Sequence, residues 1–289
     1  MSATSLTWDG RSIPGPGGLP AVAVSLTGPS LAQARTQARS AVDAGADVLE
    51  LRVDLLEEAG ALAAPDPLDA ATAAAQVLEC LRGLREAIDT TDGADAGSPV
   101  LLTCRTAAEG GRAHLDDAAY GALLRSVLDG LADWAPERRP AAIDVEVQRG
   151  CLPQVCEQAH GLGIDVVASF HDFEATPADE VLEEVLARMA REGADLAKIA
   201  VWPTSADDVA RLLGVCARAT AGAGEAAALG VPVAAMSMGA LGAVSRVAPA
   251  FGTALTFAVV PDEQGQARAS APGQLPIQDV RRCLELLRA

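Results

Sequence analysis

The alternation of short apolar segments with longer amphipathic segments, from Ala21 to the end of the chain, most restricts its fold. This alternation predicts repeated βα units, because two parallel strands need a crossover connection between them. The predicted strands number eight and cover 21–26, 47–53, 99–105, 141–147, 165–171, 195–201, 231–237 and 254–260. Eight such units predict an α/β fold in which the strands close into a (β/α)8 TIM barrel.

Amphipathic helices are predicted in the connections between these strands. The clearest candidates cover 30–44, 115–131, 177–192 and 276–288. Thr176 precedes the third of these helices, and we expect its side chain to cap the helix N-terminus. At 289 residues, the whole chain 1–289 fits one barrel domain, since such barrels commonly contain about 250 residues.

Two segments lie outside the regular alternation. Residues 1–20 contain LTWDGRSIPG, in which apolar and polar residues alternate around Asp9-Gly10, a strong hairpin signal. We expect this hairpin to cap the floor of the barrel. The connection 57–98, rich in Ala, Asp and Gly, is too long for a bare loop and is predicted to hold a helix plus a surface insertion.

The acidic charge of the chain limits its partners. A formal net charge of -17 argues against nucleic acid and against anionic membrane surfaces. The N-terminal residues show no basic region followed by an apolar core, so a cytoplasmic location is expected. The uncharged stretch 226–245 contains Pro232 and Gly239, and is predicted as loop, strand and turn rather than as a membrane span.

Cysteine and histidine spacing does not indicate a metal site. The six cysteines lack C-x-x-C spacing, and we expect them to be reduced and mostly buried. His114, His160 and His171 share no ligand spacing with them. Neither a metal nor another cofactor is therefore predicted.

Ionisable and polar residues occur where the strands of a barrel are normally apolar. Residues two apart in a strand share a face, so several of these groups point to the same side. The residues concerned are Glu50, Arg52, Arg105, Asp144, Glu146, Ser169, His171 and Lys198. Burying an unpaired charge costs several kcal/mol. Either these groups form a mutually neutralising site at the C-terminal end of the barrel, or some of them face outward.

Lys198 is the single lysine among 22 lysine and arginine residues, and it lies in the apolar run ADLAKIAVW. Arginine stays protonated in proteins, whereas a buried lysine loses proton affinity and becomes a nucleophilic amine. We therefore interpret Lys198 as a Schiff-base-forming residue. The alternative is a structural ion pair with Glu50 or Asp144.

His171 ends the predicted strand that precedes the strand of Lys198. A histidine titrates near neutral pH and can both remove and return a proton, which imine chemistry requires. We interpret it as a general acid and base, with a purely structural histidine as the alternative. His114 and His160, in loop and helix settings, are given no chemical role.

From the first strand to the C-terminus the chain resembles the type I 3-dehydroquinate dehydratases. The resemblance rests on seven motifs in the order and spacing of that family. They are ELRVD at 50–54, CRTAAEGG at 104–111, IDVEV at 143–147, SFHDF at 169–173, AKIAVWP at 197–203, MSMGALGAVSR at 236–246 and SAPGQL at 270–275. The resemblance implies a lyase of the shikimate pathway, in aromatic amino acid biosynthesis, that dehydrates 3-dehydroquinate to 3-dehydroshikimate, and it also implies a homodimer.

The resemblance implies specific roles for individual residues. Lys198 would form an imine with the ketone of 3-dehydroquinate, His171 would remove the adjacent C2 proton, and Glu109 would orient His171. Arg246 would bind the substrate carboxylate, which suits the bidentate geometry of a guanidinium. The other residues expected at the substrate are Ser25, Glu50, Arg52, Arg105, Ser270 and Gln274. The expected apolar wall and supporting charges are Met236, Met238, Phe257, Asp144 and Glu146, of which the first three also fit a plain core.

Two rival functions fit parts of the sequence. A Schiff-base aldolase also uses a barrel lysine, and Gly239 and Gly242 suit its phosphate site. Arg246 and Gln274 suit a carboxylate with hydroxyl groups instead. A catalytically silent metabolite-binding barrel would bind ligand without turnover. Dehydration of 3-dehydroquinate would identify the dehydratase, cleavage of a phosphorylated sugar the aldolase, and ligand binding without turnover the silent barrel.

Overall fold

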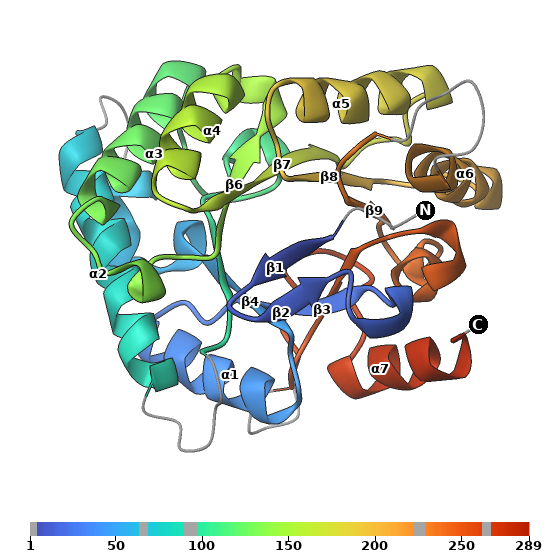
Figure 1. Cartoon of the computed structure of the whole chain (residues 1–289), viewed down its shortest axis with the longest axis horizontal. Coiled ribbons are helices and arrows are strands. Elements are labelled where there is room, and N and C mark those ends of the chain that lie inside the picture. The colour runs from blue at the N-terminus through green and yellow to red at the C-terminus, as the bar shows by residue number, and fades with distance from the viewer. Residues whose placement is uncertain (1–4, 64–68, 90–96, 222–228, 262–266, 289) are drawn as a thin grey trace.

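The computed structural model describes residues 5–63, 69–89, 97–221, 229–261 and 267–288. Eight parallel strands form one sheet in the order β10-β3-β4-β5-β6-β7-β8-β9. The strands are β3 Ala21–Leu26, β4 Val48–Arg52, β5 Val100–Thr103, β6 Ala142–Glu146, β7 Asp165–Asp172, β8 Leu196–Val201, β9 Val233–Ser237 and β10 Leu255–Ala258. The two end strands meet where Ala254 donates to Val233 across 2.7 Å, so the sheet closes into the predicted barrel (Figure 1).

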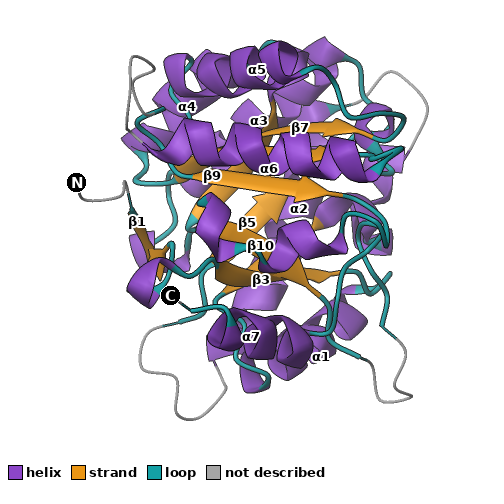
Figure 2. Cartoon of the chain, turned by 90° about the vertical axis from the view of Figure 1, so that its right-hand side faces the viewer, coloured by secondary structure: helices purple, strands orange, loops and turns teal. Residues whose placement is uncertain are grey.

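Helices surround this ring of strands (Figures 1 and 2). They are α1 Leu31–Asp43, α2 Ala70–Asp89, α3 Asp117–Leu131, α4 Leu152–Gly161, α5 Asp179–Arg191, α6 Ala206–Ala221 and α7 Ile277–Leu286. Between β9 and β10 the described chain forms two short 3-10 helices, η7 Ala243–Val247 and η8 Pro249–Phe251. The βα alternation read from the sequence is therefore confirmed, with a shorter connection at this one place.

The predicted threonine cap of α5 is wrong. The N-cap residue is Ala178, which has no side chain able to accept from the helix. Thr176 lies before Pro177 and donates its hydroxyl to the Trp202 carbonyl at 3.0 Å. Its hydroxyl therefore joins the loop after β7 to the end of β8 instead of starting the helix.

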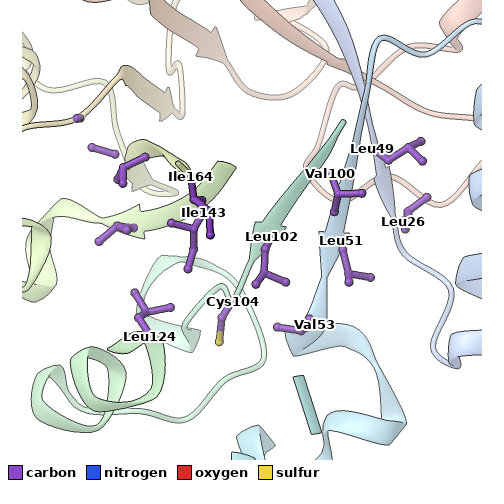
Figure 3. Close-up of a cluster of buried hydrophobic side chains, with 14 of the residues drawn as sticks. Leu26, Leu49, Leu51, Val53, Val100, Leu102, Cys104, Leu124, Ile143 and Ile164 are labelled. Atoms are coloured by element: carbon purple, nitrogen blue, oxygen red, sulfur yellow. The ribbon is translucent and has the colours of Figure 1, made fainter. Parts of the chain in front are cut away.

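Strand side chains alternate between two apolar cores, as the period of two requires. Figure 3 shows one of these cores, in which Leu26, Leu49, Leu51 and Leu102 pack on the helix-facing side of the barrel. The other core lies inside the barrel and is built at its N-terminal half from small and medium side chains. These are Ala21, Ala23, Val48, Leu101, Ala142, Val167, Leu196, Ala234 and Leu255. Polar side chains point into the barrel interior only on the C-terminal side of this layer.

The predicted N-terminal hairpin is confirmed as the antiparallel pair β1 Leu6–Trp8 and β2 Arg11–Ile13. Its turn residues Asp9 and Gly10 have φ of 44° and 79°, the left-handed conformation that Asp-Gly turns favour. Trp8 is buried with the interior core and donates to Asp165 at the start of β7 across 2.8 Å. The hairpin therefore covers the N-terminal end of the barrel, and Figure 1 shows it in front of the ring of strands.

The long connection 57–98 contains η3 Glu57–Ala63 and the helix α2. Its segments 64–68 and 90–96, where a surface insertion was expected, lie outside the described residues. In the ranges that the structure does describe, no helix is long and apolar enough to cross a membrane. All six cysteines are free, and five of them are buried.

Candidate active site

A pocket of about 450 Å³, including solvent at its mouth, opens among the C-terminal ends of the barrel strands. This is the end where barrels of this architecture carry their active sites. The residues that line it are Glu50, Arg52, Arg105, Glu109, Gly110, His171, Phe173, Lys198, Ala200, Met236, Arg246, Phe257, Ser270, Ala271 and Gln274. Residues from six strands and their following loops therefore meet at one site.

Lys198 projects into this pocket from the middle of β8. Its side chain is 6% exposed, and Nζ lies 3.6 Å from Asp144 Oδ2 and 4.0 Å from Glu50 Oε1. Nζ also lies 4.7 Å from the centroid of the Phe257 ring. Burial lowers the pKa of Lys198, and the carboxylates of Asp144 and Glu50 offset only part of that effect. The balance favours release of the proton that keeps the amine from acting as a nucleophile.

Arg105, which lines the pocket just after β5, links β6 and β7 through its side chain. Its guanidinium donates to Asp144 at 2.7 Å, to Ser169 at 2.9 Å and to Glu146 at 3.1 Å. Burial alone would raise the pKa of Asp144, but Arg105 and Lys198 hold it below its ordinary value. Asp144 therefore stays ionised, with Oδ1 bonded to Arg105 and Ser169 and Oδ2 directed at Lys198.

His171 and Glu109 form a buried pair at the side of the pocket. His171 Nδ1 lies 2.8 Å from Glu109 Oε2. Burial lowers the pKa of the histidine well below its ordinary value, and the nearby cations of Arg105 and Lys198 act in the same direction. Burial raises the pKa of Glu109 to about 8, although Arg105 opposes the rise. His171 is thus a neutral imidazole near neutral pH, the form that can accept a proton.

A chain of hydroxyl and amide groups runs from the segment after β10 to Glu50. Gln274 donates to Ser270 at 3.0 Å, and Ser270 donates to Ser25 at 2.8 Å. Ser25 in turn donates to Glu50 Oε2. Thr103 donates to the second oxygen, Oε1, at 3.0 Å. Glu50 is therefore held in one orientation facing Lys198.

Arg246 is a buried cation without a carboxylate partner among the described residues. It is 1% exposed, its NH2 donates to the Pro272 carbonyl at 3.1 Å, and its Nε meets no acceptor in the described part of the chain. Burial lowers the pKa of its guanidinium to about 10. A buried charge of this kind needs a counter-ion, and an anionic group in the pocket would supply it.

With this geometry in place, we compared the chain with known proteins. The family model described as type I 3-dehydroquinase matches residues 22–289, nearly the whole chain. The chain belongs to the type I 3-dehydroquinase family. It is therefore an enzyme of the 3-dehydroquinate dehydratase class.

Individual 3-dehydroquinate dehydratases are similar to the chain over more than nine-tenths of their length. The 3-dehydroquinate dehydratase of Klebsiella pneumoniae subsp. pneumoniae is 37% identical over 270 residues, 92% of each chain. That of Bacillus licheniformis is 36% identical over 274 residues, 93% of each chain. The solved structure of the type I enzyme from Clostridium difficile, described with covalent modified comenic acid, is 29% identical, covers 99% of each chain and has a TM-score of 0.79. That of the Geobacillus kaustophilus enzyme has a TM-score of 0.78 at 28% identity, covering 98% of this chain and 96% of the other.

The structure brings most of the residues expected from the type I 3-dehydroquinase resemblance to one place. Met236 and Phe257 line the pocket, whereas Met238 is fully buried in the barrel interior and does not line it. Asp144 Oδ2 lies 3.6 Å from Lys198 Nζ. Glu146 makes no hydrogen bond or ion pair with His171 in the described part of the chain; its carboxylate accepts from Arg105, and from the backbone and hydroxyl of Thr106, both at 2.7 Å.

Sequence reasoning missed several members of this site. Thr103 shares a strand face with Leu101 and Arg105, so period-two spacing on β5 was a signal for it. Phe173, in the SFHDF motif, lies over His171 with ring centroids 6.4 Å apart. Asp54, the last residue of ELRVD, had no such signal because it follows the strand in a 3-10 turn.

Proposed function

We propose that the enzyme dehydrates 3-dehydroquinate to 3-dehydroshikimate through a Schiff base on Lys198. The amine attacks the C3 ketone, and loss of water gives an imine. His171 removes a C2 proton, and the electron pair of that C–H bond moves toward the protonated imine. The C1 hydroxyl then leaves as water with a proton from His171, and hydrolysis of the imine releases product and the free amine.

One observation carries this proposal: a buried lysine with a lowered pKa and a neutral histidine line the same pocket. A neutral amine forms an imine, and a neutral imidazole accepts the proton made acidic by that imine. The covalently modified compound described for the Clostridium difficile relative also supports a nucleophile in this fold.

Glu109 completes the proposed proton-transfer unit. Its carboxyl group contacts Nδ1 of His171 and so fixes the orientation of the ring. The opposite nitrogen, Nε2, would then exchange protons with the substrate, because Nδ1 is already engaged. A histidine that is held in one orientation loses less entropy at the transition state.

Arg246 is the proposed ligand of the substrate carboxylate. It lines the pocket, is buried and lacks an acidic partner among the described residues. The carboxylate of 3-dehydroquinate would form an ion pair with this guanidinium. The substrate hydroxyl groups would form hydrogen bonds with the linked polar side chains, which include Ser270, Gln274 and Glu50. Arg52 and Arg105 are already paired with carboxylates, so they would orient the substrate more than they would neutralise its charge.

Borohydride reduction with 3-dehydroquinate, followed by peptide mass mapping, tests the mechanism. We expect a reduced adduct on the peptide that carries Lys198, which is unambiguous because the chain contains no other lysine. The Lys198→Arg variant is the control and should give no adduct. Turnover without an adduct, or an adduct on another residue, would refute the Schiff base. Cleavage of a phosphorylated sugar in place of dehydration would identify an aldolase.

We also propose that the enzyme acts as a homodimer in the cytoplasm. This proposal is supported by the resemblance to the type I dehydratases rather than by a contact within the chain. Analytical ultracentrifugation would give a mass twice that of the 29.4 kDa chain if the homodimer forms. A single species at the monomer mass across micromolar concentrations would contradict it.

A further inference from the structure

Asp54 accepts four hydrogen bonds from three different residues. Arg52 donates Nε and NH2 to its two oxygens, both at 2.8 Å. The backbone N–H of Arg105 donates to Oδ1 at 3.2 Å, and that of Arg112 donates to Oδ2 at 3.2 Å. The carboxylate is 0% exposed, so no solvent replaces these donors if it is removed.

Arg105 and Arg112 lie near the two ends of a closed loop, 105–113, that leaves β5 and returns beside it. The backbone of Ala107 donates to Ala113 at 2.8 Å, and that of Ala113 donates to Arg105 at 3.2 Å. Gly111 lies so close to Arg105 that a Cβ at this glycine would be 2.1 Å from the Arg105 carbonyl oxygen. The loop is therefore folded tightly on itself at its base.

Glu109 lies at the apex of this loop, in the 3-10 turn Ala107–Glu109. The loop holds Glu109 beside His171, which belongs to a different strand. The position of the Glu109 carboxyl group relative to β7 thus depends on how firmly the base of the loop is attached to the barrel.

Two buried carboxylates make that attachment. Glu146 bonds the backbone N–H and the hydroxyl of Thr106, on one arm of the loop. Asp54 bonds both arms, through Arg105 and Arg112. Asp54 therefore joins both arms of the loop to the turn that follows β4, in addition to the backbone bonds that close the base of the loop.

We propose that Asp54 is a positioning residue for the dehydration reaction, which acts by holding loop 105–113 so that Glu109 orients His171. It does not line the pocket and so does not touch substrate. The inference rests on the proposed function of His171 and Glu109. A simpler role, as the ion-pair partner of Arg52 alone, would affect substrate binding but not proton transfer.

Two variants separate these roles. Asp54→Glu keeps the charge that pairs with Arg52, but its added methylene moves the acceptor oxygens away from the two backbone N–H groups. Asp54→Asn removes the charge and leaves only one side-chain oxygen to accept. The matched control is Asp47→Asn, because Asp47 also accepts from a backbone N–H, that of Val22 at 2.8 Å, and pairs with Arg281, but lies at the opposite end of the barrel.

The measurements are kcat, KM, the pH profile of kcat and the rate of borohydride trapping at Lys198. We expect Asp54→Glu to lower kcat about 10- to 100-fold, as a misplaced reacting group does, with KM changed little. Asp54→Asn should lower kcat similarly and also raise KM through Arg52. Trapping should stay near the wild-type rate in both variants, because Lys198 is held by β8 and Asp144. The pH profile of kcat should shift in both, since a freed Glu109 meets water, and Asp47→Asn should match wild type.

Several results would overturn this inference. A wild-type kcat in Asp54→Glu would show that Asp54 acts only as the ion-pair partner of Arg52. Equal losses in kcat and in trapping, or unfolding of both variants at 25 °C shown by circular dichroism, would assign Asp54 a general structural role. If the wild-type enzyme itself gave no adduct or no turnover of 3-dehydroquinate, the proposed function would be refuted. That result differs from the others because it appears in the wild-type enzyme and not only in the Asp54 variants.

Discussion

Lys198 Nζ lies 3.6 Å from Asp144 Oδ2, and that oxygen accepts no hydrogen bond from the residues that the structure describes. The other oxygen, Oδ1, is bonded to Arg105 and Ser169. One oxygen of the carboxylate thus fixes its position, while the other faces the amine alone. A protonated imine on Lys198 would find its counter-charge already in place, without reorganisation.

Asp144→Asn is expected to move the pH profile of turnover to lower pH by about 1 unit, as loss of an opposite charge at this distance does. Asp144 raises the pKa of the Lys198 amine, and it would equally raise that of the imine. Without the charge, the amine is free at lower pH, and the imine also loses its proton at lower pH. Both limbs of kcat against pH should therefore shift in the same direction. Asp165→Asn, at the barrel floor, is the control, and an unshifted profile in Asp144→Asn would contradict the role.

His171→Ala is expected to form the imine yet lose turnover by about 10²- to 10⁴-fold, the range for removal of a general base. In the wild-type enzyme, the lowered pKa of His171 has a second consequence. The base is neutral as pH falls through its ordinary value and loses this form only well below it, so His171 itself should add no acid limb to kcat/KM near pH 6.5. Normal turnover in His171→Ala would show that another group is the base.

Arg246→Met is expected to stabilise the empty enzyme while preventing substrate binding. The variant removes a buried charge that lacks an acidic partner among the described residues, so the free energy of unfolding should rise by about 1 kcal/mol or more. Denaturant unfolding measures this change, and equilibrium binding of 3-dehydroquinate measures the loss. Arg85→Met is the control, because the equally buried Arg85 donates to the Ser98 and Arg139 carbonyls and should destabilise when removed. A destabilised Arg246→Met would mean that the site does not need an anion.

Gly110→Ala and Gly150→Ala form a matched pair. Both glycines follow a 3-10 turn with positive φ, 80° and 72°, so each substitution should lower stability by about 1 to 2 kcal/mol. Only at Gly110 would the new Cβ meet another residue, lying 2.4 Å from the Phe173 ring beside His171. We expect similar thermal midpoints for the two variants but a lowered kcat only in Gly110→Ala. Equal kcat values would show that the Phe173 contact does not affect the reaction.

The eight strands, and the residues that share a face of each strand, could be predicted from the sequence because both depend on local geometry. Side chains alternate along a strand with a period of two, so Asp144 and Glu146 had to share a face whatever the rest of the chain did. The same rule put Ser169 with His171, and the single lysine stood out against the arginines without any structure. The Asp-Gly hairpin also follows from the backbone preferences of two residues.

The partners of these groups could not be predicted in the same way. Whether Glu146 meets His171 or Thr106, and whether Met238 lines the pocket, depends on the relative register of strands that are distant in sequence. Asp54 lies in a turn, where no period applies, and its partners are 51 and 58 residues away at Arg105 and Arg112.

The sequence by itself therefore determined the number of strands, which charged residues share a strand face and the identity of the nucleophile candidate. Only the tertiary structure decided which carboxylate holds which cation, which arginine is left for an anion and how Glu109 reaches His171. The physical reason is that side-chain alternation is a property of each strand, whereas closure of the barrel sets the stagger between strands and so chooses the contacts.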